Sequence, residues 1–219
     1  MTEALQKTYQ LRFSGVEEYR RQVWQVLTEN FFQKYVAKVA AILDLGCGWG
    51  EFINHIQTGE KYGMDLNPDS GQRLNPEVTF LHQNCSARWQ LPDGRLDMVF
   101  TSNFFEHLPS KDHLSRTLQQ AKRCLKPGGR ILYLGPNIRY LPGSYWDFWD
   151  HHIPLTHLLL MEILRMSDFQ VERCIPRFLP YTMAGEKRPS LRLVRWYLKL
   201  PIAWRVFGRQ FLVLGRNGG

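Results

Sequence analysis

The chain has 219 residues, of which 44% are hydrophobic and 22% are charged. These values fit one globular domain with a sizeable core, and the length excludes two domains of ordinary size. The first ten residues lack the apolar segment of a signal peptide, and no run approaches the roughly 18 apolar residues of a spanning helix. The four cysteines, at 47, 85, 124 and 174, show neither paired nor zinc-like spacing. We therefore expect reduced thiols in a cytoplasmic protein.

The net charge of +8 is concentrated near the C-terminal end of the sequence. Residues 1–186 balance to zero, whereas residues 187–219 contain eight basic residues and no acid. A basic stretch of this kind suggests contact with an anionic partner, which composition alone does not identify.

The N-terminal region predicts a loop followed by one amphipathic helix. Residues 9–15 are expected to form a short loop that could fold over a ligand site. Residues 17–39 have apolar side chains at helical spacing, namely Val23, Val26, Leu27, Phe31, Tyr35 and Val39. Three polar residues could close the site or bind an anionic acceptor, or be ordinary surface residues: Tyr9, Arg12 and Arg20.

The next segment predicts a strand, a glycine turn and a helix. The apolar run 40–43 leads into Asp44-Leu45-Gly46-Cys47-Gly48-Trp49-Gly50, and Phe52, Ile53 and Ile56 then recur at helical spacing. Gly46 and Gly48 allow the backbone to approach a ligand closely. The spacing differs from the G-x-G-x-x-G turn of dinucleotide sites, and the Asp44 carboxylate suits an ammonium group better than a pyrophosphate.

Two further strands follow, each ending in polar residues. Residues 61–66 predict a second strand that ends near Asp65, nineteen positions after Gly46, close to the interval of an acid that binds ribose hydroxyls. The alternative for Asp65 is a surface position at the turn before Pro68. Residues 78–81 predict a third strand, which is followed by Asn84 and Cys85.

The middle of the chain predicts strand, helix and strand in succession. Residues 96–103 form the fourth predicted strand and lead into Glu106-His107-Leu108. A helix over 111–125 stops at Lys126-Pro127-Gly128-Gly129, because Pro and Gly cannot continue it. Residues 130–134 form the fifth strand.

Taken jointly, these motifs resemble those of the class I S-adenosylmethionine-dependent methyltransferases. The residues that carry the resemblance are the D-x-G-x-G-x-G turn, Asp65, the Glu106-His107-Leu108 segment and Leu125-Lys126-Pro127-Gly128-Gly129. The match covers residues 40–134 strongly and 139–176 more loosely. It implies an α/β domain whose Rossmann-like, seven-stranded, mostly parallel sheet has helices on both faces.

The resemblance also implies a place for S-adenosylmethionine at the carboxyl ends of the first two strands. Asp44 and the turn at Gly46, Cys47 and Gly48 would hold the methionine part, and Asp65 the ribose. Around the adenine and the sulfonium it places Leu66, Asn84, Cys85 and Asn103. Asn84 stands where the family commonly has an acid, although its side-chain oxygen can still accept the adenine amino group.

The acceptor side is predicted to lie in the loop 135–154, before a helix over 155–166 without an obvious cap and a strand over 169–176. The candidates for a general base are His107, Asp147, Asp150, His151 and His152. His107 could instead cap or pack beside the next helix, and the loop could be an aromatic plug. Its spacing matches no recognised ligand pattern, so we predict no metal site.

The insertion 177–209 separates the sixth strand from a last strand over 210–215. Ser190 can cap a helix that runs to Leu200, on which Arg192, Arg195 and Lys199 form one stripe. Residues 190–207 allow three interpretations: a membrane-interface helix, a nucleic-acid surface, which the composition favours least, or a structural cover.

The sequence therefore predicts a single methyltransferase domain over 1–219, with an N-terminal lid and helix (1–39), a core (40–176), the basic insertion and the last strand. The favoured acceptor is an oxygen of a small molecule, a glycan sugar or a lipid-linked intermediate. The alternatives are RNA or protein methylation, a non-catalytic cofactor-binding module and, against the glycine spacing, a nicotinamide oxidoreductase. We expect a cytoplasmic protein, peripheral at the inner membrane surface if residues 190–207 bind lipid. Acceptor identity and oligomeric state stay open.

Overall fold

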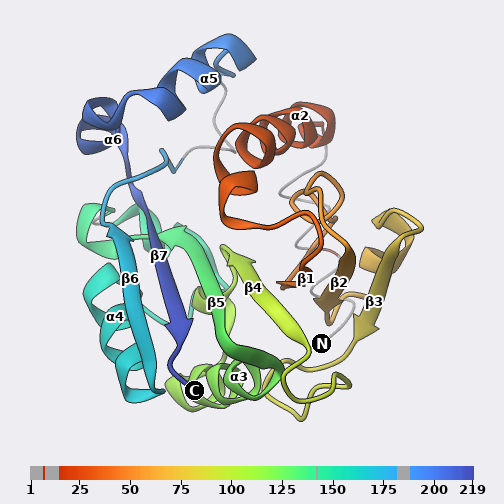
Figure 1. The fold of residues 1–219 in the computed structure, drawn as a ribbon. Coiled ribbons are helices and arrows are strands. Elements are labelled where there is room, and N and C mark those ends of the chain that lie inside the picture. The colour runs from red at the N-terminus through yellow and green to blue at the C-terminus, as the bar shows by residue number, and fades with distance from the viewer. Residues whose placement is uncertain (1–6, 8–14, 142, 182–187) are drawn as a thin grey trace.

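The computed structural model describes residues 7, 15–141, 143–181 and 188–219 (Figure 1). Its sheet has seven strands in the order β3-β2-β1-β4-β5-β7-β6. The strands are β1 Ala41–Leu45, β2 Glu60–Asp65, β3 Val78–His82, β4 Leu96–Ser102, β5 Leu125–Pro136, β6 Phe169–Ile175 and β7 Gln210–Asn217. The pairs among β1 to β5 are parallel, whereas β7 is antiparallel to both β5 and β6. The predicted Rossmann-like, mostly parallel sheet is confirmed, with β7 as its antiparallel member.

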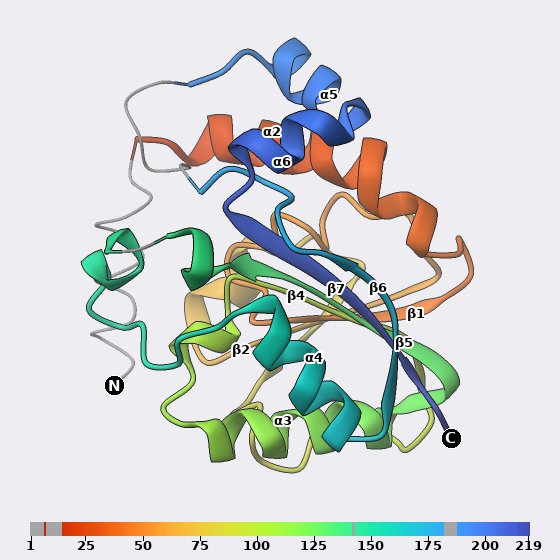
Figure 2. The same cartoon turned by 90° about the vertical axis from the view of Figure 1, so that its left-hand side faces the viewer.

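Helices lie on both faces of this sheet. The α-helices are α2 Glu17–Leu27, α3 Lys111–Cys124, α4 His157–Met166, α5 Leu191–Lys199 and α6 Pro201–Phe207. The shorter helical turns are η1 Thr28–Phe32, η2 Gln33–Tyr35, η3 Pro68–Arg73, η4 Phe105–His107, η5 Ile138–Tyr140 and η6 Ser144–Asp147. Figure 2 shows α2, α5 and α6 on one side of the sheet and α3 and α4 on the other.

The core is divided into two halves by the sheet, and β1 contributes to both. Leu43 and Leu45 pack on the side of α3 and α4, whereas Ile42 packs on the side of α2. All three side chains are fully buried. A strand that is covered on both faces needs apolar residues at successive positions, which is why this segment reads as a continuous apolar run.

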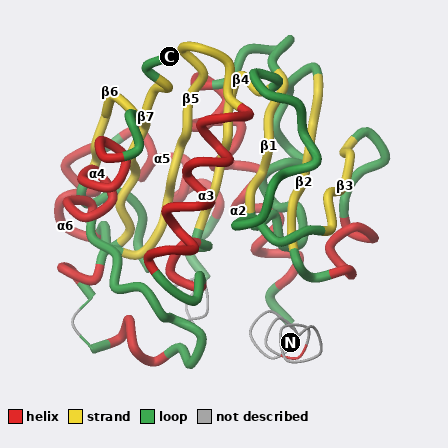
Figure 3. Tube along the Cα trace, turned by 90° about the horizontal axis from the view of Figure 1, so that it is seen from below, coloured by secondary structure: helices red, strands yellow, loops and turns green. Residues whose placement is uncertain are grey.

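The strand order reverses next to β1. The chain leaves β1 toward β2 on one side and returns through β4 on the other, where β4 pairs with both β1 and β5. Ligands of open α/β sheets bind outside the carboxyl ends of the strands at such a switch point. We therefore expect the ligand site at the carboxyl edge of β1, β2 and β4. Figure 3 shows these strands side by side.

The N-terminal helix is shorter than the predicted 17–39. The regular α2 ends at Leu27, a π turn over Thr28–Phe32 follows, and Val39 is 88% exposed. The wider π turn lets the adjacent rings of Phe31 and Phe32 both enter the core, where each is at most 2% exposed. Most of the predicted loop 9–15, with Tyr9 and Arg12, lies outside the described residues.

Three other predicted boundaries are corrected. The segment after the glycine turn forms turns over 51–55 rather than a regular helix, although Phe52, Ile53 and Ile56 are buried as expected. Strand β5 starts at Leu125 rather than at residue 130. Leu125 already pairs with Leu96 of β4, and the register between the two strands shifts across the glycine-containing segment before Arg130 pairs with Met98. Helix α4 does have a cap, since the Thr156 side chain accepts a hydrogen bond from the Leu159 N–H.

The insertion forms the expected helix, α5, and a second short helix, α6, follows it directly. Ser190 caps α5 by accepting from the Leu193 N–H, and α6 begins at Pro201. The four cysteines are free thiols. Among the described residues, no helix has the length and apolar character needed to cross a bilayer.

Candidate functional site

The glycine turn after β1 forms the first wall of the site. Gly46, Gly48 and Gly50 all have positive φ, at 71°, 52° and 77°, a conformation that side chains with a Cβ rarely adopt. A Cβ on Gly46 would lie only 2.4 Å from the ring of Phe104, which follows β4. The turn therefore needs glycine both for its backbone and for the close approach of the β4 connection.

Asp65 holds the turn against the end of β2. Its two carboxylate oxygens accept hydrogen bonds from Gly48 N–H at 2.9 Å and from Asn67 N–H at 2.8 Å. The side chain is 8% exposed, and burial raises the pKa of Asp65 although these backbone bonds act in the opposite direction. Each carboxylate oxygen can accept a further donor, as a ribose-binding acid must.

Asp44 lies deeper than Asp65 and close to it. Its side chain is 3% exposed and accepts a hydrogen bond from the backbone of Ile53. Burial, and then the carboxylates of Glu51 and Asp65, raise the pKa of Asp44 well above its ordinary value. Three neighbouring carboxylates create a negative potential, which favours a ligand with positive charge.

Cys47 and Cys85 contribute packing more than polar contacts. A Cβ on Gly63 would lie 3.2 Å from the Cys47 sulfur, which shows that this buried thiol faces β2. The Cys85 sulfur accepts from Thr117 at 3.4 Å, on the side of α3. Burial raises the pKa of both thiols, so neither is a reactive thiolate.

Three predicted cofactor residues are exposed around this edge, namely Leu66, Asn84 and Asn103. The side-chain oxygen of Asn84 already accepts from Ser86 N–H at 2.9 Å and from Ser86 Oγ at 2.8 Å. Contact with an adenine amino group would therefore need one of these bonds to open. Asn103 has a positive φ of 49° and holds the end of β4 through its N–H to Leu134 O. Such backbone strain is concentrated at functional sites.

Arg20, for which the sequence left open a role in closing the site, in binding an anionic acceptor or as a surface residue, forms an ion pair with Glu51 beside the glycine turn. It therefore links α2 to the segment that follows β1. This contact places a basic side chain next to the carboxylates of the site without identifying an acceptor anion.

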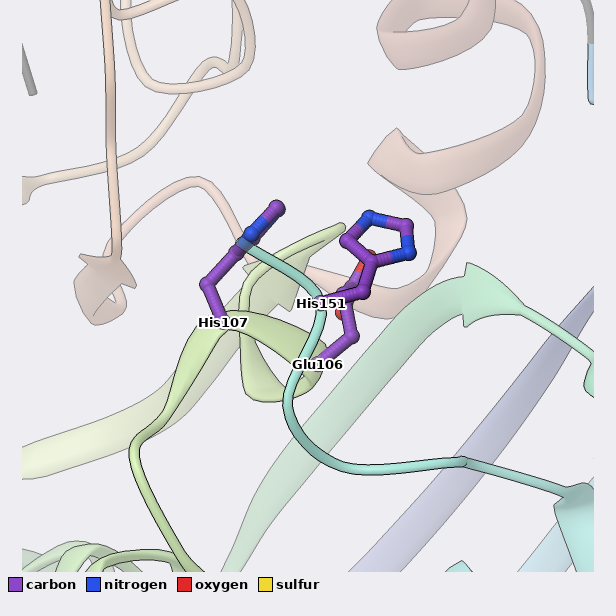
Figure 4. A group of neighbouring side chains, drawn as sticks. All are labelled: Glu106, His107 and His151. Atoms are coloured by element: carbon purple, nitrogen blue, oxygen red, sulfur yellow. The ribbon is translucent and has the colours of Figure 1, made fainter. Parts of the chain in front are cut away.

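The acceptor side contains a polar cluster built from two segments (Figure 4). Glu106 and His107 come from η4 after β4, and His151 comes from the loop after β5. One potential ligand atom from each of the three lies within 4.8 Å of those of the other two. His107 Nδ1 is 3.1 Å from a carboxylate oxygen of Asp150 and 3.1 Å from its carbonyl oxygen.

The partners of the two imidazoles determine their tautomers. His107 Nδ1 faces only acceptors, so it carries a proton and donates to Asp150. His151 Nδ1 likewise donates to Tyr145 O at 2.8 Å. In each neutral ring the lone pair is then on Nε2, which is the atom that can take a proton from a ligand or bind a cation.

The charges around His107 favour its protonated form. Burial by itself lowers the pKa of His107, but the hydrogen bond to Asp150 and the charges of Glu106 and Asp150 outweigh it, and the net pKa is raised. Glu106 is 1% exposed, and burial raises its pKa against the opposing effects of His107 and a 3.4 Å hydrogen bond from Tyr133. Shifted pKa values of two neighbouring groups are typical of a functional site.

The loop that supplies His151 is attached to the end of β4 through its backbone. The carbonyl of Glu106 accepts from His152 N–H at 2.8 Å and from Ile153 N–H at 3.2 Å. The side chains of His152 and Asp147 are exposed and are not among the clustered groups. Of the five candidate bases, His107, Asp150 and His151 are thus brought together, and Asp147 and His152 are not.

The cluster also has the composition of a metal site, although the sequence predicted none. Imidazole and carboxylate suit several divalent cations, and the Nδ1 bonds of both histidines are the contacts that orient such ligands. The sequence did not identify Glu106 as a candidate site residue, and it did not predict that Asp150 contacts His107. The sequence signal that points to this cluster is the Glu106-His107 pair directly after a strand that ends at the switch point.

Comparison with known proteins identifies the family of the chain. A family model described as a methyltransferase domain matches residues 16–172. Over 170 residues the chain is 27% identical to the "probable methyltransferase ltbC" of Aspergillus luteorubrus, covering 68% of this chain and 57% of that protein. Over 133 residues it is 25% identical to a chloroplastic tocopherol O-methyltransferase of Arabidopsis thaliana, covering 56% of this chain and 33% of that protein. The chain spans about half the length of the curated relatives it matches.

The fold also has counterparts among solved structures. An S-adenosylmethionine-dependent methyltransferase from Archaeoglobus fulgidus superposes with a TM-score of 0.67 at 19% identity. The superposition covers 95% of this chain and 97% of that one. At this level of identity the likeness concerns the fold.

Proposed function

The chain belongs to the family of class I S-adenosylmethionine-dependent methyltransferase domains, and we propose that it transfers the donor's methyl group to a hydroxyl oxygen. The observation that carries the proposal is the His107–Asp150 pair directly beyond the strand end that borders the cofactor edge. A base at this position is what a protonated oxygen acceptor requires.

The residues at the carboxyl edge fit the donor. Glu51 is already paired with Arg20, but the carboxylates of Asp44 and Asp65 repel each other, and a ligand with an ammonium and a sulfonium charge relieves that repulsion. The Gly46–Gly50 turn allows close backbone approach, and Asp65 offers acceptors for ribose hydroxyls. When bound, the donor supplies an electrophilic methyl group.

The proposed role of His107 is to remove the acceptor proton. Nε2 takes the proton of the hydroxyl while the oxygen forms its bond to the methyl carbon and the carbon–sulfur bond breaks. Asp150 keeps the imidazole in the required tautomer and stabilises the imidazolium that results. Such a base contributes about 10²–10⁴-fold to the rate, and alignment of the reactants supplies roughly 7–11 kcal/mol.

The acceptor class is inferred from the loop that supplies Asp150. Trp146 and Trp149 of this loop are 55% and 97% exposed, and exposed aromatic faces suit the ring of a sugar or a phenol. The tocopherol O-methyltransferase relative acts on an oxygen by its name. We therefore propose a small-molecule, glycan-sugar or lipid-linked acceptor, with the hydroxyl directed at His107.

Calorimetry with S-adenosylhomocysteine tests the donor site, and release of that product in the presence of phenols, oligosaccharides and lipid-linked saccharides tests the acceptor. We expect binding, and turnover in one acceptor class. Binding without turnover in any class, even with cell extract, would mean a non-catalytic module, and the absence of binding would end the proposal. Turnover should survive EDTA. Activity that is lost with EDTA and restored by a divalent cation would place a metal at Glu106, His107 and His151 and remove His107 as the base.

A further inference from the structure

Helices α5 and α6 lie on the same side of the sheet as α2 (Figures 1 and 2), and both carry exposed apolar side chains. Six large apolar side chains are exposed there: Leu193 (59%), Trp196 (66%), Leu200 (45%), Ile202 (73%), Val206 (56%) and Phe207 (61%). These six residues, together with the exposed basic residues Arg192, Arg195, Lys199 and Arg205, are called the α5–α6 surface. Contiguous exposed apolar side chains mark an interaction site in a folded protein.

Helix α5 is divided lengthwise into three stripes. Leu191, Val194 and Leu198 face the core beside α2. The exposed basic residues and the exposed apolar residues each follow i, i+3, i+7 spacing, offset by one position, in the sets Arg192, Arg195, Lys199 and Leu193, Trp196, Leu200. At 3.6 residues per turn these sets form neighbouring stripes along the solvent side. A helix with apolar and cationic stripes side by side has the pattern of an interfacial helix.

The helices that carry this surface are already anchored to the domain. Trp204 is buried against Phe31 and Phe178, and its indole N–H donates to Tyr197 O at 2.8 Å. The Arg177 guanidinium donates to the carbonyls of Val206 and Gly208. The exposed apolar side chains are therefore not a core face left open, because the core face of each helix is filled.

We propose that the α5–α6 surface docks on an anionic phospholipid bilayer. Trp196, Phe207 and Ile202 would enter the boundary between headgroups and acyl chains, while the adjacent basic stripe pairs with lipid phosphates. No ion pair to Arg192, Arg195, Lys199 or Arg205 is found within the described ranges, and residues 187–219 contain no acid that could neutralise them. The charge is thus available to an anionic partner.

The other occupants fit less well. A second copy placed face to face through a twofold axis would bring two basic stripes together, and like charges in contact disfavour such a dimer. Nucleic acid would use the basic side chains but has no partner for aliphatic residues such as Leu193 and Ile202. Of these three occupants, a bilayer is the one that uses both stripes.

Vesicle flotation of the full chain tests the proposal. We expect binding to vesicles of phosphatidylcholine mixed with phosphatidylglycerol, and little binding to phosphatidylcholine alone. Raising the ionic strength from about 0.01 M to about 1 M should weaken it, because the Debye length falls roughly tenfold. Hydrogen exchange should show that amides of residues 191–207 become protected when anionic vesicles are added, and this measurement needs no substitution.

Two sets of variants separate the stripes. Arg192→Gln with Arg195→Gln and Lys199→Gln should weaken binding by roughly 100-fold, since each basic residue near an anionic surface contributes about fivefold. Trp196→Ser with Phe207→Ser should also reduce it, even at low salt. The matched controls are Lys111→Gln on α3 and Met166→Ser on α4, where Met166 is 74% exposed on the opposite side of the sheet. Neither control should change vesicle binding.

Three results would overturn the proposal. The first is a failure to float with anionic vesicles at low salt. The second is binding to which both variant sets are indifferent although circular dichroism shows them folded. The third is a dimer in solution that dissociates on Trp196→Ser with Phe207→Ser, because the surface would then be an interface between copies. RNA binding abolished by the basic variants alone, without vesicle binding, would favour the nucleic-acid alternative instead.

Discussion

Replacing Asp65 by alanine should weaken the binding of S-adenosylhomocysteine by about 10- to 150-fold. The carboxylate is expected to accept from ribose hydroxyls, and a hydrogen bond to a charged group contributes about 1.5–3 kcal/mol, which is the basis of this range. The loss should be in affinity for the cofactor and should be the same with every acceptor.

The same substitution should also lower the free energy of unfolding. It removes the acceptor of two buried N–H groups, those of Gly48 and Asn67, at 2.9 and 2.8 Å. An unpaired buried donor costs about 1–3 kcal/mol, so the upper limit is about 6 kcal/mol, and water entering beside the 8% exposed side chain will reduce it. The affinity must therefore be measured where the variant is still folded.

Isothermal titration calorimetry below the unfolding transition measures the affinity, and Asp97→Ala is the matched control. Asp97 also accepts from a strand N–H, that of Ala41 at 2.8 Å, and from Lys126 at 2.7 Å, but it lies where β1 and β4 begin. This control should lose stability and keep its affinity. If folded Asp65→Ala binds within twofold of the unmodified chain, the carboxylate does not contact the cofactor and the assignment of the ribose site is wrong.

The remaining predictions concern the base and the turn. His107→Gln should lower kcat by about 10²–10⁴-fold and leave calorimetric cofactor affinity unchanged, and an undiminished kcat would exclude it as the base. The rate should rise with pH, because the base must be neutral, with a midpoint above the ordinary value of about 6.5 since the pKa of His107 is raised. Asp150→Asn should move this midpoint of the pH–rate profile down, and an unchanged midpoint would contradict the pairing. By linkage, the pairing of protonated His107 with Asp150 stabilises the fold fully at pH values below the pKa of His107 in the unfolded chain. This contribution is lost as the pH rises through the raised pKa of His107 in the folded protein. Gly46→Ala should lower the melting temperature and abolish cofactor binding, because its Cβ would meet the Phe104 ring at 2.4 Å on a backbone with φ of 71°; wild-type binding by this variant would show that the turn can relax.

The strand ends could be predicted because local chemistry decides them. The glycines after β1 follow an apolar run that only a covered strand accommodates, and Asp65 lies at the end of the neighbouring strand β2, nineteen positions after Gly46. The same holds for Ser190, whose capping role depends only on its own hydroxyl and a backbone N–H three residues later.

The polar cluster could be predicted only in part, since it depends on long-range placement. His107 and Asp150 are 43 residues apart, and their contact exists because the carbonyl of Glu106 receives the backbone of the loop near His152. No sequence pattern predicts that this loop binds to the backbone of Glu106. The helical spacing of apolar residues likewise predicted one long N-terminal helix. In the structure a π turn interrupts it, and Phe31 and Phe32 are both buried there.

The pairing of β6 has a consequence for how the domain can vary. In the described sheet β6 pairs only with β7, so the two strands form an antiparallel hairpin whose connection contains α5 and α6. The base of that hairpin is closed by bonds from Phe178 N–H to Gln210 O and from Gln210 N–H to Leu179 O. The solvent-facing parts of this connection can vary between related chains without altering β1 and β2, which are separated from β7 by β4 and β5 in the sheet. The proposed membrane contact can therefore vary between related chains separately from the residues proposed to hold the donor.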